Sequence, residues 1–317
     1  MRVRGASLVV AMTTVASGCV RPPDPAAGPP PVPAGRVWRA LPSAVTTPDR
    51  APAVLTAEDR RRLTRTLDDY LDDRPGRVAA AVFDRATGTG YTYRDNRHFL
   101  LASVAKVGIL AALLLKAEAA RRPLTRHERS LAEVMIRKSD NRAARELYAA
   151  IGGQNGLARV MHALGAGDTW PGPGPYWGVT RSRPSEQLKV LWALSSPSGP
   201  ISAANRRLAA ALMSSVVSPQ AWGVSAAASA GDHVSLKNGW LPARVHGGLW
   251  TVNSIGRLRS DDHDLLVAVL SERSPGKDTG IATVERVARL MVGALRREPR
   301  LRREPRLGQE RRPGQGA

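Results

Sequence analysis

Ser103 and Lys106 have the residue types and the spacing for nucleophilic catalysis. Residues three apart on a helix share one face, one turn from each other. At a helix N-terminus the hydroxyl would lie near the positive end of the helix dipole, beside backbone N–H groups that could hold an oxyanion. A lysine removed from water has a lowered pKa and could take the hydroxyl proton. The pair therefore predicts a serine nucleophile with a lysine base.

Two further segments indicate a function only when they are considered together with residues 103–106. Residues 139–141 (Ser-Asp-Asn) fall between two predicted helices, where each residue type is also an ordinary helix N-cap. Residues 237–239 (Lys-Asn-Gly) end a predicted strand and could form a plain turn. A second Ser-x-x-Lys, at residues 274–277, is expected to be an ordinary turn because it contains Pro and Gly.

Together and in this order, the three segments resemble the signature of class A β-lactamases and penicillin-binding proteins. The resemblance extends through residues 99–102 before the serine and 151–165 after the second segment, and it covers about 56–295. It implies a β-lactamase/transpeptidase-like α/β (α+β) fold. We therefore expect a mixed antiparallel sheet built from both chain ends, flanking helices, and an all-helical insertion at about 103–230.

The resemblance also implies catalytic roles. Ser103 would be the nucleophile that forms an acyl-enzyme, and Lys106 its base or the group that orients a base. Ser139 would carry the proton to the leaving nitrogen, and Lys237 would lower the cost of that transfer.

Four positions are expected to bind substrate on the same basis. Asn141 would hold the substrate amide, and the backbone N–H groups of Ser103 and Trp240 would form an oxyanion hole next to Gly239. Asn238 stands where the family usually has Thr or Ser, and it could donate a hydrogen bond to a substrate carboxylate.

Two departures from the family bear on turnover. Class A β-lactamases carry a loop Glu that activates water, but the corresponding residues 169–185 contain neither Asp nor Glu. Glu186 comes next, and the helical pattern places it on the following helix. Slow deacylation is therefore expected. The interval of 36 residues between Ser103 and Ser139 is also shorter than in the β-lactamases, which predicts a more open cleft.

The same loop is rich in aromatic residues. Trp170, Tyr176 and Trp177 lie among Pro and Gly. They could form an aromatic lip for a peptide or glycan, or they could fill the space that a longer loop would occupy.

The elements that must position these residues follow from hydrophobic periodicity. Thr56 caps a helix with leucines at 63, 67 and 71, and residues 78–83 and 89–93 form a β-hairpin. A buried helix covers 104–120. Further helices are expected at about 128–138, 141–151, 154–164, 185–195, 204–216 and 278–295, and strands at 233–237, 249–255 and 265–271.

The N-terminus resembles a bacterial lipoprotein signal. Two arginines precede an apolar stretch at 6–16, and small residues lead to Cys19, the only cysteine. We expect a signal peptide at 1–18, lipidation of Cys19 and a Pro/Ala/Gly-rich linker at 19–55. Ordinary secretion with a chance cysteine is the alternative. Residues 296–317 form a basic, disordered tail.

Composition excludes several other classes. One cysteine among 317 residues cannot build a disulfide framework or a zinc ribbon, and no apolar run reaches the roughly 18 residues of a membrane span. The formal charge of +20 comes mainly from arginine, a bias typical of GC-rich genomes. The six histidines lack metal-ligand spacing. We expect no metal, no cofactor and no nucleic-acid partner.

The sequence therefore predicts an exported serine hydrolase, anchored by lipid outside the cytoplasmic membrane. Its substrates would be cell-wall D-amino-acid peptides or β-lactams. Two alternatives remain: a working β-lactamase that uses another general base, and a non-catalytic, cell-wall-binding lipoprotein.

Overall fold

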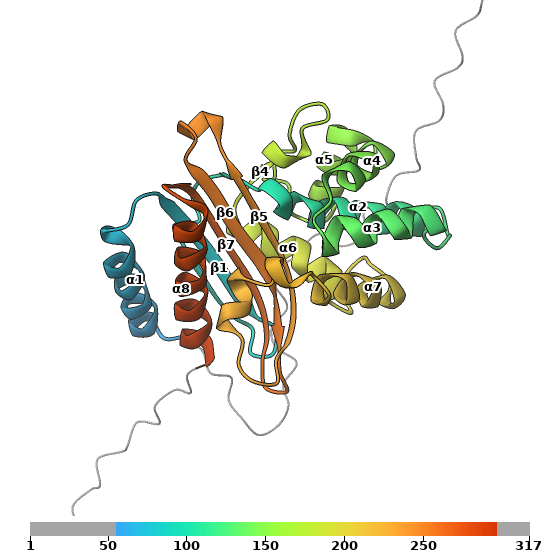
Figure 1. Ribbon diagram of the computed structural model, residues 1–317. Helices are drawn as coiled ribbons and strands as arrows, with labels where there is room; N and C mark the ends of the chain where they lie inside the picture. Colours follow the sequence, from blue (N-terminus) through green and yellow to red (C-terminus); the bar gives the residue numbers. More distant parts are fainter. Residues whose placement is uncertain (1–54, 297–317) are drawn as a thin grey trace, which may run out of the picture. The chain divides into compact units, whose positions relative to one another are not determined.

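The computed structural model describes residues 55–296 (Figure 1). Cys19, the expected signal peptide, nearly all of the linker and the tail after 296 lie outside the described residues. Within 55–296, no helix combines the length and apolar character needed to cross a membrane. The elements are α1 Ala57–Asp72, β1 Arg77–Asp84, β2 Thr89–Tyr93, β3 Phe99–Leu100, η1 Ala102–Val104, α2 Ala105–Ala119, α3 Arg126–Arg137, α4 Asn141–Ala150, α5 Gly153–Ala163, η2 Trp177–Val179, β4 Arg181–Ser182, α6 Pro184–Ser195, α7 Ala203–Ser214, η3 Ser218–Gln220, η4 Gly223–Ala227, β5 His233–Pro242, η5 Arg244–His246, β6 Trp250–Arg259, β7 Asp264–Ser274 and α8 Lys277–Arg296.

The five-stranded sheet has the order β2-β1-β7-β6-β5. Its strands come from both ends of the described chain, as the sequence predicts, and helices α2 to α7 lie between them in sequence. All four neighbouring pairs are antiparallel. A separate two-stranded ladder, which the sequence analysis missed, joins β3 to β4.

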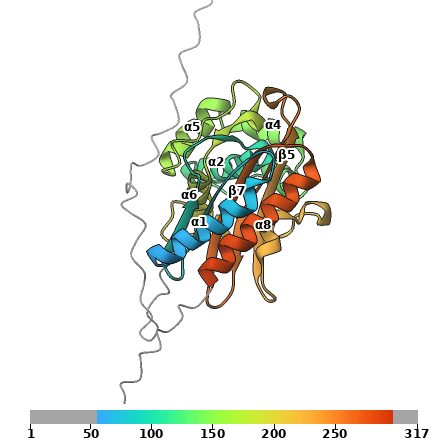
Figure 2. The same cartoon turned by 90° about the vertical axis from the view of Figure 1, so that its left-hand side faces the viewer.

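Both faces of the sheet are covered by helices, and its middle strand, β7, has apolar side chains on both faces. On β7, Val267 and Val269 pack into a core with α1 and α8, whereas Ala268 and Leu270 pack into a core with the other helices. This alternation is the period of two that a strand imposes on its side chains. Figure 2 shows α1 and α8 side by side across one face of the sheet.

Helix α2 is the centre of the larger core and carries Lys106. Every residue from Ala105 to Leu114 is buried, because α2 packs against the other helices on all sides. A helix that is apolar around its whole circumference must lie inside a protein. The lysine that the sequence predicts as a base is thus fixed on a fully packed helix.

The structure corrects the expected end of the first late strand. β5 runs on to Pro242, so residues 237–239 lie in the middle of the strand and form no turn. Its pairing with β6 is unbroken from His233 to Pro242, and the chain turns only after Pro242. A glycine at 239 suggested a turn, but in the structure it allows β5 to approach the backbone at Ser103 closely.

Replacing Leu110 by Ala tests the core around α2. Leu110 has no solvent exposure, so the cavity left behind should lower the free energy of unfolding by about 2–5 kcal/mol. Urea denaturation measures this difference. Leu249→Ala is the matched control because Leu249 is 38% exposed, and its loss should stay within about 0.5 kcal/mol. Equal losses for the two variants would contradict the packing described here.

Candidate active site

Ser103 lies in the short helix η1, directly before α2. Its neighbour Ala102 has a φ of 49°, a left-handed conformation that residues with a side chain rarely adopt. The Val104 N–H donates to the Leu101 carbonyl at 3.1 Å and closes this turn. The strained turn places the Ser103 hydroxyl 2.9 Å from the Lys106 ammonium nitrogen.

Asn253, on β6, holds the segment before Ser103. Its amide nitrogen donates to the carbonyls of Leu100 at 2.7 Å and Leu101 at 3.1 Å, and its oxygen accepts from the Ser271 N–H at 2.9 Å. Asn253 is fully buried, and a buried amide is stable only when its bonds are satisfied. The sequence analysis missed this residue. The same strand also contains Thr251, Ser254 and two arginines, so a polar residue at this position gave no distinctive signal in the sequence.

Gly239 brings the edge strand β5 against the backbone at Ser103. A Cβ atom at this position would lie 2.7 Å from the Leu101 oxygen and from the backbone nitrogens of Ser103 and Val104. Only glycine allows this close approach. The strand therefore meets the backbone of Ser103 at Gly239, one residue before Trp240, whose N–H is expected from the sequence to contribute to an oxyanion hole.

Ser139 connects the two lysines. The Lys106 nitrogen lies 3.0 Å from the Ser139 hydroxyl and 2.6 Å from its carbonyl oxygen, and the Lys237 nitrogen lies 3.0 Å from the same hydroxyl. Ser139 has a φ of 57°. The next residue, Asp140, caps α4 by accepting from the Ala143 N–H. All four predicted catalytic residues are therefore in one hydrogen-bonded cluster.

Burial controls the charge of both lysines, which have no solvent exposure. It lowers the pKa of Lys106 to about 7, an effect that the nearby Asp140 carboxylate partly opposes. Burial also lowers the pKa of Lys237 well below the ordinary value for lysine, and the charge of Lys106 lowers it further. A neutral amine is a proton acceptor, so Lys106 can serve as a base near neutral pH.

The side-chain amide of Asn141 contacts the cluster through its oxygen and faces solvent through its nitrogen. Its oxygen accepts from Lys106 at 2.8 Å. Its amide nitrogen has no hydrogen-bond partner in the described part of the chain, and the residue is exposed. Asn141 is thus oriented by the lysine with two N–H donors left free.

The structure corrects the role expected of Asn238. Its amide nitrogen donates to the carbonyls of Gln220 and Trp222, both at 2.8 Å, so no amide hydrogen is left for a substrate carboxylate. Successive strand residues point to opposite faces, and Lys237 already occupies the face toward Ser139. Gln220, which the sequence analysis did not single out, accepts from Lys237 at 3.4 Å.

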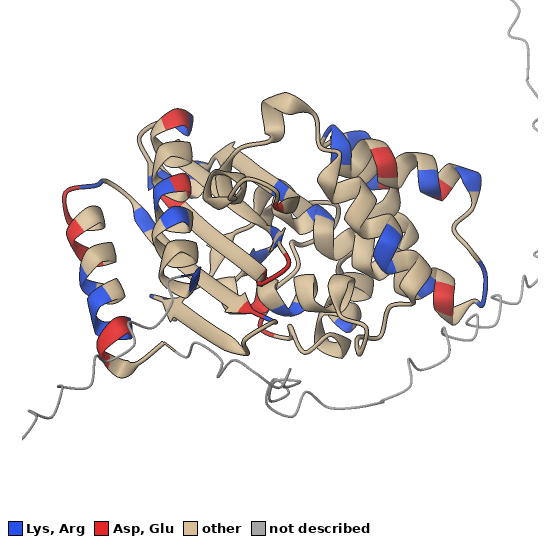
Figure 3. Cartoon of the chain, turned by 90° about the horizontal axis from the view of Figure 1, so that it is seen from below, with Lys and Arg blue, Asp and Glu red and all other residues tan. Residues whose placement is uncertain are grey.

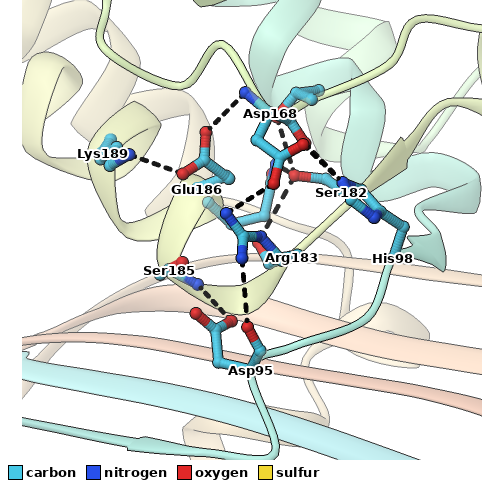
Figure 4. A network of polar contacts seen from close by, with 10 residues as sticks. Asp95, His98, Asp168, Ser182, Arg183, Ser185, Glu186 and Lys189 are labelled. Carbon is cyan, nitrogen blue, oxygen red and sulfur yellow. Dashed lines mark hydrogen bonds and ion pairs between the residues drawn. The ribbon is translucent and has the colours of Figure 1, made fainter.

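A polar network closes the neck of the loop at 168–183 and also engages Glu186 (Figure 4). Asp168 and Arg183 form an ion pair at 2.5 Å. The Glu186 carboxylate accepts from the Asp168 N–H at 3.0 Å and pairs with Lys189 at 2.5 Å. As expected, Glu186 lies on the following helix, α6. Among the described residues, no carboxylate is hydrogen-bonded to Ser103, Lys106 or Lys237.

The three loop aromatics differ in how far they are buried. Tyr176 is 67% exposed, and Trp170 is 53% exposed and stacks on His98 with ring centroids 3.7 Å apart. Trp177 is partly buried, and its ring centroid lies 4.7 Å from the Lys106 nitrogen. Trp177 therefore fills space over the hydrogen-bonded cluster that contains Lys106, whereas Tyr176 remains at the surface.

A large cavity of about 1100 Å³ lies elsewhere, between α6, α7 and the sheet end opposite the catalytic cluster. None of the predicted site residues lines it. Its wall contains several arginines, two of which, Arg85 and Arg257, pair with Asp264. Figure 3 views the molecule from below and shows basic and acidic positions close together where the sheet meets the helices.

Solved structures with the same fold are class A β-lactamases. A variant of the last common ancestor of Gram-negative class A β-lactamases matches with a TM-score of 0.64 at 24% identity, over 74% of this chain and 98% of that one. The class A β-lactamase of Bacteroides cellulosilyticus matches with a TM-score of 0.64 at 19% identity, over 75% and 98%. The β-lactamase of Streptosporangium roseum gives 0.63 at 22%, over 76% and 99%. The β-lactamase-like fold is therefore established.

Sequence comparisons agree with the fold. LppW of Mycobacterium tuberculosis and of Mycobacterium bovis, which carries a lipoprotein name, is 27% identical over 255 residues, covering 77% of this chain and 80% of that protein. The model of the β-lactamase enzyme family matches residues 123–295, more than half of the chain. The chain belongs to the β-lactamase enzyme family.

Proposed function

We propose that this protein is an exported serine hydrolase that forms an acyl-enzyme on Ser103. The observation that carries the proposal is the hydrogen-bonded cluster of Ser103, Lys106, Ser139 and Lys237, whose two lysines have lowered pKa values. A buried lysine beside a hydroxyl is an arrangement that activates a nucleophile. The substrates are β-lactams or cell-wall peptides that contain D-amino acids.

In the first step, neutral Lys106 takes the Ser103 proton across 2.9 Å. The Ser103 oxygen then attacks the carbonyl carbon of the amide bond, and the carbonyl oxygen becomes an oxyanion. The backbone N–H groups of Ser103 and Trp240 stabilise it, because donors already in place stabilise developing charge without reorganisation. Asn141 holds the substrate through its free amide hydrogens.

In the second step, the C–N bond breaks and the leaving nitrogen takes a proton from the Ser139 hydroxyl. Lys106 returns the proton to Ser139 across 3.0 Å, while Lys237 holds the same oxygen from the other side. An ester between the substrate acyl group and Ser103 results. It persists, since no carboxylate in the described cluster is placed to activate water for its hydrolysis.

The proposed location is the outer side of the cytoplasmic membrane. The Cys19 signal predicted from sequence agrees with the lipoprotein name that the LppW relatives carry. We propose that lipid on Cys19 anchors the protein, and that cell-wall peptide is therefore within its reach.

Intact-mass spectrometry with a simple penicillin tests this proposal. The wild-type protein should gain the mass of one intact drug molecule and keep it over an hour, while Ser103→Ala should gain none. Ser274→Ala is the matched control: Ser274 belongs to the second Ser-x-x-Lys, its hydroxyl bonds to the Gly276 carbonyl, and its loss should leave the adduct unchanged.

Two outcomes would overturn parts of the proposal. Rapid hydrolysis of the drug without a lasting adduct would indicate a working β-lactamase that uses another general base. Absence of both adduct and drug consumption would remove the support for β-lactam acylation and favour the non-catalytic wall-binding protein.

The acylation rate should depend on pH through Lys106. Only the neutral amine accepts the serine proton, and the neutral fraction grows as pH rises through a pKa of about 7. Stopped-flow measurements of acylation should show a rate that falls about tenfold per pH unit below this value and levels off above it.

The variant Lys106→Arg tests whether position 106 must lose a proton or need only carry a positive charge. Arginine keeps a cation at the position and does not lose its proton, so this variant should not acylate anywhere between pH 5 and 9. Lys189→Arg, on α6 and paired with Glu186, is the control with unchanged kinetics. A flat pH profile in the wild type would contradict the assignment of Lys106 as the base.

A further inference from the structure

Trp177 covers the catalytic lysine. Its ring centroid lies 4.7 Å from the Lys106 nitrogen, within the range of a cation–π contact. The same nitrogen is within 3.0 Å of four oxygen atoms, from Ser103, Ser139 and Asn141. With these contacts in place, the Lys106 side chain has no solvent exposure. Water reaches the amine only if a neighbour moves.

The ring is held by the backbone of its own loop. The Trp177 carbonyl accepts hydrogen bonds from the Thr180 hydroxyl at 2.7 Å and from the Thr180 N–H at 3.1 Å. The Thr180 carbonyl in turn accepts from the Leu101 N–H at 2.8 Å, two residues before the nucleophile. The position of Trp177 is therefore tied directly to the strained turn that presents Ser103.

Close packing inside the loop fixes this arrangement further. The Gly172 N–H donates to the Thr180 hydroxyl at 3.1 Å, and the Gly172 carbonyl accepts from the buried Tyr148 hydroxyl at 3.1 Å. A Cβ at Gly172 would lie 2.0 Å from the Tyr176 carbonyl. The loop is thus locked to the helical core, and the Trp177 ring is part of a rigid wall.

We infer that Trp177 is a positioning residue that shields Lys106 from water and thereby lengthens the life of the acyl-enzyme. The inference rests on the proposed acylation of Ser103. Hydrolysis of the ester requires water to add to the acyl carbonyl carbon, the bond to the Ser103 oxygen to break, and a proton to pass from water, through a base, back to that oxygen. Lys106 is the base nearest to Ser103, and the indole ring excludes water from it.

The other charged groups around Lys106 do not replace a water-activating base. Lys237 is linked to Lys106 through the Ser139 hydroxyl. Lys237 is itself fully buried, so it is no more accessible to water than Lys106 is. Asp140 uses a carboxylate oxygen to cap α4 through Ala143. Indole has no acid–base chemistry at neutral pH, so the loop supplies a shield where a carboxylate would supply a base.

Removal of the ring tests the inference. In Trp177→Ala, the penicilloyl adduct followed by intact-mass spectrometry should decay at least tenfold faster than in the wild type. Trp177→Phe keeps an aromatic cover and should stay within about threefold. Tyr176→Ala is the matched control, because this neighbouring side chain is 67% exposed and should not affect the adduct lifetime.

The pH profile separates shielding from general damage to the loop. Hydration of Lys106 in Trp177→Ala should move the inflection of the acylation rate upward by about one pH unit or more, because burial is the main cause of its lowered pKa. Trp177→Phe and Tyr176→Ala should keep the wild-type inflection. A structural defect alone would lower the rate at every pH without moving the inflection.

Four results have distinct meanings. A shorter lifetime and a shifted inflection in Trp177→Ala alone would support the shield. An unchanged lifetime in a variant that melts like the wild type and still acylates would overturn the shield and leave the proposed function standing. If Trp177→Ala does not fold, Trp177→Leu takes its place, because leucine keeps apolar bulk without the aromatic face. The adduct of Trp177→Leu should decay faster than that of Trp177→Phe, and equal decay would overturn the inference. A wild-type protein that forms no adduct would instead overturn the proposed function.

Discussion

The site depends on the burial of two lysines against one serine hydroxyl. Lys106 and Lys237 each place a nitrogen 3.0 Å from the Ser139 oxygen, and neither side chain has solvent exposure. Removal of an ammonium group from water is costly, and two like charges so close together disfavour double protonation. The fold tolerates this arrangement because each amine keeps several oxygen partners. The neutral form that burial favours is also the form that the proposed acylation requires.

Backbone strain is concentrated at the same place. Ala102 and Ser139 both have left-handed backbone conformations, although neither is glycine. Such residues cost of order 1–3 kcal/mol each and persist only where their surroundings fix them. Here Asn253 holds the carbonyls before Ser103, and Lys106 holds the carbonyl of Ser139. The rigid packing of α2 and the sheet thus maintains two unfavourable turns that bring the hydroxyls to the lysines.

Sequence alone predicted the fold and the four central residues, because their order and spacing are characteristic and the periodicity of the long helices and strands is clear. Residues whose role arises from contacts between distant segments were missed or misassigned. From the sequence, Trp177 could lie at the surface or fill space inside the loop. Its contact with Lys106 and the hydrogen bond from Leu101 to its loop show that it fills space beside the lysine. Asn238 was expected to bind substrate because it stands where the family usually has Thr or Ser, but the carbonyls of Gln220 and Trp222 accept both of its amide hydrogens. Gly239 resembled a turn residue, whereas the close approach of β5 to Ser103 requires glycine in mid-strand.

The protonation state of Lys106 is the central claim, and it can be observed without substrate. The chain contains only six lysines, so labelling lysine with ¹³C at Cε gives a small set of NMR signals, which single Lys→Arg variants assign. The Lys106 signal should titrate near pH 7 while the protein remains folded. Titration of that signal near 10.4, the ordinary pKa of lysine, would show an ammonium group that cannot accept the serine proton and would contradict the account.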